Sequence, residues 1–117
     1  MDDRLKKWFY DVKVAIDEIE LFLSMESVNF DNYSEHIMLK RAVERNLEII
    51  GEAIKRIIST EESYIKLITD SHNIIGLRNQ VIHAYDNISD EIIWSVIETH
   101  LPKLKFEILK IMDNFKQ

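Results

Sequence analysis

Apolar residues recur every three or four positions along most of the chain, which is the spacing of one face of an α-helix. The pattern predicts a first helix from about Asp3 to about Ser24, a second from about Ser34 to about Ser59, and a third from Asp70 or Ser71 to about Tyr85. Ser89 suits the N-cap of a fourth helix. The pattern of that helix continues through Pro102 almost to the last residue.

The segments between these helices contain weaker signals. The connector 25–34 is rich in capping residues, and it predicts a short helical turn within Asn29–Ser34. The connector 59–70 predicts one short helix, Glu61–Ile68. Pro102 must either kink the fourth helix or begin a new one, because proline has no N–H to donate. Gly51 lies in the middle of the second helix, which indicates that another helix passes close to it.

These elements predict an all-α fold, because no segment shows the alternating pattern of a strand. Four long helices with short connectors favour an antiparallel four-helix bundle, with up to five helices, in a single domain 1–117. Composition agrees: the chain has only 2 Gly and 1 Pro among 117 residues, too few for the many tight turns of a sheet protein.

Composition also limits the possible functions. There is no cysteine, so disulfides, thiolate metal sites and thiol nucleophiles are excluded. The first residues lack an apolar signal core, and no run of about 18 apolar residues predicts a membrane span, so we expect a cytoplasmic protein. The net charge of −6 argues against a non-specific nucleic-acid coat, but a local basic groove remains compatible with action on RNA.

One octapeptide, from Arg78 to Tyr85, carries more chemically useful side chains than any other segment. It contains a guanidinium at Arg78, an amide at Asn79, an imidazole at His83 and a phenol at Tyr85. A guanidinium suits phosphate by its charge and its forked donors. An imidazole exchanges protons near neutral pH. The octapeptide therefore suggests chemistry at a phosphodiester, although such residues on an amphipathic helix also serve as solvated side chains.

Helix geometry separates two of these groups. At about 100° per residue, Asn79 and His83 share one face, which Gly76 leaves open, whereas Arg78 shares a second face with Tyr85. Arg78 and His83 therefore point roughly 140° apart. Three arrangements bring both to one atom: the helix frays before His83, the long arm of Arg78 wraps around it, or a second copy of the chain completes the site.

The remaining motifs of hydrolytic and phosphate sites are absent. The four histidines, His36, His72, His83 and His100, lack the i,i+4 spacing of a metallohydrolase helix. A glycine-rich phosphate loop and a serine nucleophile elbow are also missing. We therefore expect neither a metal site nor a cofactor.

The spacing Arg78-Asn79-x3-His83-x-Tyr85 resembles the Arg-x4-6-His signature of HEPN domains. More narrowly, it resembles the Arg-x4-His-x-Tyr form of HepT toxins, which are the ribonuclease partners of minimal nucleotidyltransferase (MntA) antitoxins. None of the four named positions departs from the family pattern.

The resemblance extends beyond the octapeptide over nearly the whole chain. The block from Ala42 to Ala53 is similar to the second helix of the family, and Ile74–Leu77 leads into the motif as it does there. Trp94 and the segment Leu101–Leu104 also occupy matching places. The two connectors, 25–34 and 59–70, are the parts least like the family.

The resemblance implies a homodimer in which two motif helices line one cleft. It also implies that the protein is an endoribonuclease that acts without a metal ion. His83 would act as general base on the ribose 2′-hydroxyl and as acid for the leaving oxygen. Arg78 would hold the scissile phosphate, and Asn79 would orient the phosphate or His83. Tyr85 would receive AMP from ATP through the MntA-type antitoxin and so block the site.

Two other functions stay open at this point. The chain could be a non-catalytic helical module that docks and regulates a nucleotidyltransferase, which the acidic net charge favours. It could also be a structural or regulatory dimer with the motif residues in salt bridges, and with Tyr85 as a core or interface aromatic.

Overall fold

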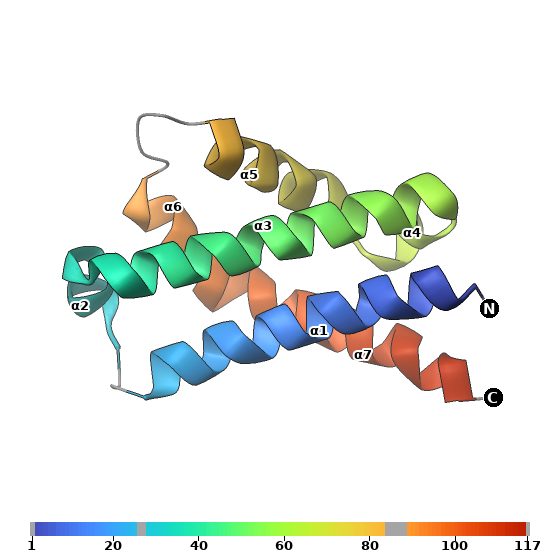
Figure 1. Cartoon of the computed structure of the whole chain (residues 1–117), viewed down its shortest axis with the longest axis horizontal. Helices are drawn as coiled ribbons and strands as arrows, with labels where there is room; N and C mark the ends of the chain where they lie inside the picture. The colour runs from blue at the N-terminus through green and yellow to red at the C-terminus, as the bar shows by residue number, and fades with distance from the viewer. Residues whose placement is uncertain (1, 26–27, 84–88, 117) are drawn as a thin grey trace.

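The computed structural model describes residues 2–25, 28–83 and 89–116, and it contains helices and no strand in that part of the chain. The helices are α1 (Asp3–Ser24), α2 (Phe30–Glu35), α3 (Ile37–Thr60), α4 (Tyr64–Leu67), α5 (Ser71–His83), α6 (Asp90–Ser95), a π-helical turn (Val96–His100), α7 (Leu101–Asp113) and a final 3₁₀ turn (Asn114–Lys116). The four long segments run alternately in opposite directions (Figure 1). The predicted all-α antiparallel bundle is confirmed.

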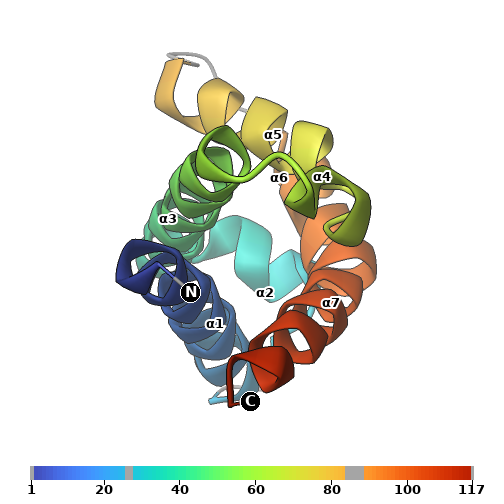
Figure 2. The same cartoon turned by 90° about the vertical axis from the view of Figure 1, so that its right-hand side faces the viewer.

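The core lies between α1, α3 and the helical segment from α6 to α7, which surround it when the bundle is viewed end-on (Figure 2). Its largest fully buried side chains include Phe9, Ile16, Ile54 and Ile108. Helix α5 differs, because it packs mainly on α3 and most of its described side chains are only half-buried or exposed. Within the described residues, every helix is too short or too polar to cross a membrane.

The predicted start of the second long helix was wrong. Ser34 belongs to the separate helix α2, and α3 begins at Ile37. The backbone leaves the helical region at His36 (φ −98°, ψ 92°), whose Nδ1 accepts the N–H of Leu39 at 3.1 Å and so caps α3. The short turn predicted within Asn29–Ser34 is confirmed as α2. Helix α4 covers only part of the segment 61–68 predicted for it.

Pro102 lies in the first turn of α7, which confirms one of the two alternatives, that the proline begins a new helix. Helices α6 and α7 are joined by the π-helical turn, in which the N–H of Leu101 donates to the carbonyl of Val96, five residues earlier. A proline ring clashes with the carbonyl four residues before it in a regular α-helix, and the wider π turn removes this clash. The helical segment from α6 to α7 therefore runs without a break through this turn.

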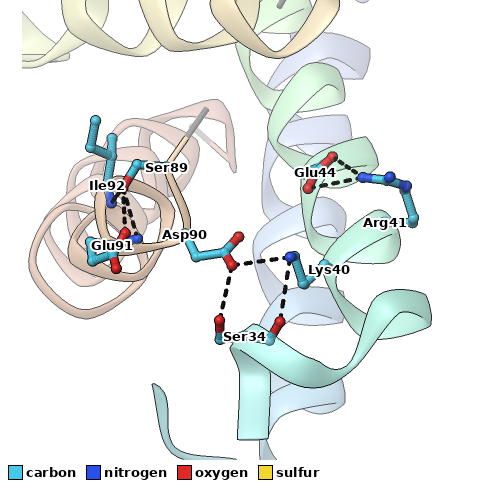
Figure 3. A network of polar contacts seen from close by, with 8 residues as sticks. All are labelled: Ser34, Lys40, Arg41, Glu44, Ser89, Asp90, Glu91 and Ile92. Carbon is cyan, nitrogen blue, oxygen red and sulfur yellow. Dashed lines mark hydrogen bonds and ion pairs between the residues drawn. The ribbon is translucent and has the colours of Figure 1, made fainter. Parts of the chain in front are cut away.

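A polar network holds the start of α6 against α2 and α3 (Figure 3). Asp90 Oδ2 accepts from Ser34 Oγ and from Lys40 Nζ, both at 3.0 Å. Ser89 caps α6 as predicted, because its Oγ accepts the N–H groups of Glu91 and Ile92. The buried phenol of Tyr33 lies against Trp94 nearby, and burial raises the pKa of Tyr33. The network fixes the chain directly after residues 84–88.

Gly51 allows α5 to approach α3, as its position in the sequence predicted. A Cβ built on Gly51 would overlap Arg78 Cβ and would lie 2.8 Å from Arg78 Cγ and 3.3 Å from the carbonyl oxygen of Ile74. By contrast, a Cβ on Gly76 would meet nothing within 4 Å. Only the first glycine is therefore required for packing.

This difference predicts opposite effects of two alanine substitutions. Gly51→Ala should lower the free energy of unfolding by about 1–3 kcal/mol, because the added methyl must push α5 away from α3. Gly76→Ala should raise it by up to about 1 kcal/mol, because alanine favours the helix and has open space there. Urea unfolding followed by circular dichroism measures both. Equal destabilisation by the two variants would contradict the close approach at Gly51.

Candidate functional site

Helix α5 carries three of the four residues that the sequence singles out. Arg78 and Asn79 lie in its middle, and His83 is its last residue. The structure describes the backbone of His83 but not its side chain, and Tyr85 lies outside the described residues. Arg78 and Asn79 can therefore be placed with their contacts, whereas the predicted roles of His83 and Tyr85 stay predictions.

The guanidinium of Arg78 is held from two sides. Its Nη2 forms an ion pair with Glu52 Oε2 at 2.7 Å, and its Nη1 donates to Asn79 Oδ1 at 2.8 Å. Its Nε is buried, and the side chain as a whole is 20% exposed. Each Nη nitrogen carries two N–H groups and takes part in one of these contacts, and the N–H groups of a guanidinium bind phosphate oxygens.

Glu52 is the residue of this site that the sequence analysis missed. It belongs to α3, and its second oxygen, Oε1, lies 3.2 Å from Arg56 Nε one turn later. The Glu52–Arg56 spacing reads as an ordinary surface pair of a solvated helix face. The available signal was the neighbouring Gly51, because a helix that passes over a glycine also reaches the residue beside it.

A cavity of about 230 Å³ borders Arg78 between α1, α3 and α5. Its lining is completed by Trp8 and Asp11 of α1 and by six residues of α3, among them Arg45, Glu48, Glu52 and Arg56. The carboxylates are paired within the protein, since Asp11 contacts Lys7 and Glu48 contacts Arg45. The cavity is therefore a polar recess whose charges are largely balanced.

The opposite side of α5 forms a second, more apolar groove of about 330 Å³ against α6 and the π turn. Gly76 opens it, as expected from the sequence, and Ile74, Leu77, Ile92 and Val96 supply much of its apolar lining. Ile92 is 50% exposed, which is high for an isoleucine. Helix α5 thus has one face fixed on α3 and another face that the single chain leaves partly uncovered.

The structure places Arg78 relative to α3. Arg78 lies on the face of α5 that contacts α3, and its arm is held there by Glu52 and Asn79. The side chain of His83 lies outside the described residues, so the three arrangements that would bring it and Arg78 to one atom stay predictions. Asn79 contacts Arg78, whereas the resemblance implied that Asn79 orients the phosphate or His83. Among the described residues, no group of three or more His, Asp or Glu side chains could hold a metal ion.

Comparisons with known proteins agree with this fold. The model of the family "Ribonuclease HepT-like" matches residues 12–111. A protein of Caldanaerobacter subterraneus subsp. tengcongensis named "Putative RNase TTE0752" is 30% identical over 103 residues, which cover 86% of this chain and 90% of that protein. "Probable ribonuclease HepT" of Thermococcus cleftensis is 29% identical over 106 residues, which cover 91% and 94% of the two chains. No solved structure matches the chain significantly.

The fold and the motif helix define an all-α bundle of the HEPN type with a polar motif on a peripheral helix. The family match covers most of the chain, including every residue of the octapeptide from Arg78 to Tyr85. The chain belongs to the ribonuclease HepT-like family.

Proposed function

We propose that this chain is the toxin of a HepT/MntA-like type VII toxin–antitoxin system and acts as a metal-independent endoribonuclease. The observation that carries the proposal is that the matched family region contains the complete Arg78-Asn79-x3-His83-x-Tyr85 motif. The orientation of Arg78 by two neighbours supports it, because a phosphate-binding guanidinium works best when its geometry is fixed before the substrate arrives.

In the proposed reaction His83 removes the proton of a ribose 2′-hydroxyl, and the 2′-oxygen attacks the adjacent phosphorus. The bond from phosphorus to the 5′-oxygen breaks, and a protonated imidazole returns a proton to that leaving oxygen. Arg78 stabilises the charge that develops on the phosphate oxygens. The products are a 2′,3′-cyclic phosphate and a free 5′-hydroxyl. DNA lacks the attacking hydroxyl and should resist cleavage.

The reaction requires Arg78 and His83 at one phosphate, and we propose that a homodimer provides this. On one straight helix the two residues point roughly 140° apart, so a cleft between two copies of α5 brings Arg78 of one copy towards His83 of the other. The apolar groove beside Gly76 and Ile92 is a suitable contact surface, because it flanks the motif and is partly uncovered in the single chain.

Tyr85 is proposed as the point of control. An MntA-type nucleotidyltransferase would join the phenol oxygen to the α-phosphorus of ATP, with release of diphosphate. The attached AMP would place a negative phosphate beside the motif, where it competes with RNA phosphate for Arg78.

The ribonuclease activity predicts a simple loss on substitution. The purified chain should cleave single-stranded RNA in the presence of EDTA, and Arg78→Ala and His83→Ala should each lower kcat by about 100-fold or more, because each removes a transition-state contact. Gel analysis of the products, with DNA of the same sequence as a control, measures this. Equal cleavage by wild type and variants, or nucleotidyltransferase binding without any cleavage, would favour the non-catalytic docking module.

The dimer predicts a second result. Ile92→Glu should convert a dimeric chain to a monomer and lower RNA cleavage with it, because a carboxylate cannot be buried unpaired in an apolar contact. Phe106→Glu is the matched control, since Phe106 is 68% exposed but lies on α7, away from this groove. Size-exclusion chromatography with light scattering gives the mass. A monomeric wild type with full activity would contradict the dimer.

The control step predicts a change of mass. The chain co-expressed with a nucleotidyltransferase of the MntA type should carry one or more AMP units, and Tyr85→Phe should carry none. Intact-mass spectrometry followed by peptide mapping measures both. AMP attached elsewhere, or no mass change, would remove Tyr85 from the proposal.

A further inference from the structure

We propose that Glu52 is a positioning residue for Arg78, so that α3 determines where the motif guanidinium lies. This inference rests on the proposed ribonuclease function, because it assigns Arg78 to the phosphate. Its starting observation is the 2.7 Å ion pair between Glu52 Oε2 and Arg78 Nη2, which joins two helices rather than two neighbours on one helix.

The backbone supports the same contact. Gly51 removes the side chain that would separate α3 from α5, and the Cβ and Cγ atoms of Arg78 lie directly over it. The arm of Arg78 is thus confined at its base by the glycine and at its end by the carboxylate of the next residue. Few conformations of the arm remain, although a free arginine side chain has many.

The second contact completes the orientation. Asn79 Oδ1 accepts from Nη1, while Glu52 holds Nη2. The Nε atom is buried, so a ligand from solvent meets the guanidinium at its Nη end. Bidentate binding of a phosphate needs two N–H groups in one plane. The hydrogen bond to Asn79 restricts that plane, while the ion pair with Glu52, which lacks hydrogen-bond geometry, restricts the position of the guanidinium.

The pairing leaves positive charge at the site. Glu52 also contacts Arg56, so two guanidiniums share one carboxylate and the three groups sum to +1. Arg56 remains 56% exposed, whereas Arg78 is 20% exposed. Glu52 therefore anchors Arg78 and leaves the cluster with a net positive charge. A phosphate diester carries one negative charge and is attracted to such a cluster.

Glu48 is a natural control for Glu52. It lies one turn earlier on α3 and lines the same cavity, but its carboxylate pairs with Arg45, which is 71% exposed. Exposed pairs on one helix contribute little to structure. A substitution of Glu48 changes the charge of the cavity as Glu52→Gln does, but it leaves Arg78 held.

The first experiment compares steady-state RNA cleavage by the full chain and its Glu52→Gln and Glu48→Gln variants. We expect Glu52→Gln to lower kcat about 10- to 100-fold with KM within about threefold, because a guanidinium displaced by about 1 Å loses much of its effect on the transition state. Glu48→Gln should keep both constants. Thermal unfolding shows whether each variant is folded, and Glu52→Asp, which keeps the charge on a shorter arm, should give an intermediate kcat.

The second experiment separates positioning from stability. Guanidinium ion added at millimolar concentration should restore part of the activity of Arg78→Ala, because Glu52 and Asn79 still offer its binding groups. It should restore none in the double variant Arg78→Ala/Glu52→Gln. If Glu52 were needed only for folding, the rescue of Arg78→Ala by guanidinium would not depend on the charge of Glu52.

The outcomes distinguish this inference from the proposed function. If Arg78→Ala cleaves RNA as well as the wild type, the proposed function fails. If Arg78→Ala is inactive while Glu52→Gln matches Glu48→Gln, or if guanidinium rescues the single and double variants equally, the positioning role alone is overturned.

Discussion

The contact between α3 and α5 at Gly51 is the constraint on which the motif depends. Helix α5 packs mainly on α3, and a side chain at Gly51 would occupy the space of Arg78. The glycine reduces intrinsic helix stability by up to about 1 kcal/mol relative to alanine, so its presence in the middle of a 24-residue helix has to be offset by the packing that it permits. The packing brings Arg78 within reach of Glu52.

The two sides of α5 make different contacts. The side towards α3 fixes Arg78 through an ion pair between helices, which defines a geometry that local sequence cannot impose. The other side carries Gly76 and partly exposed apolar residues of α5 and α6. A peripheral helix with one fixed and one uncovered side is suited to a site that two copies of a chain share, because the uncovered side stays available for the second copy.

The segments that follow α5 in the chain are fixed to the rest of the bundle. Asp90 ties the start of α6 to Ser34 and Lys40, so the segment after residues 84–88 has a fixed origin (Figure 3). The π turn before Pro102 lets α6 and α7 continue as one helical segment that closes the core. The bundle thus holds α5 in place without burying it.

The sequence by itself determined the fold class, the number of long helices, the cap at Ser89 and the need for close packing at Gly51, because these follow from local periodicity and capping chemistry. It also identified the octapeptide and the divergence of Arg78 and His83. Only the tertiary structure decided that α3 begins at Ile37, that Pro102 lies behind a π turn and that Lys40 pairs with Asp90. The pairing of Glu52 with Arg78 belongs to the same group, since the two residues are distant in sequence and meet only when α5 packs on α3.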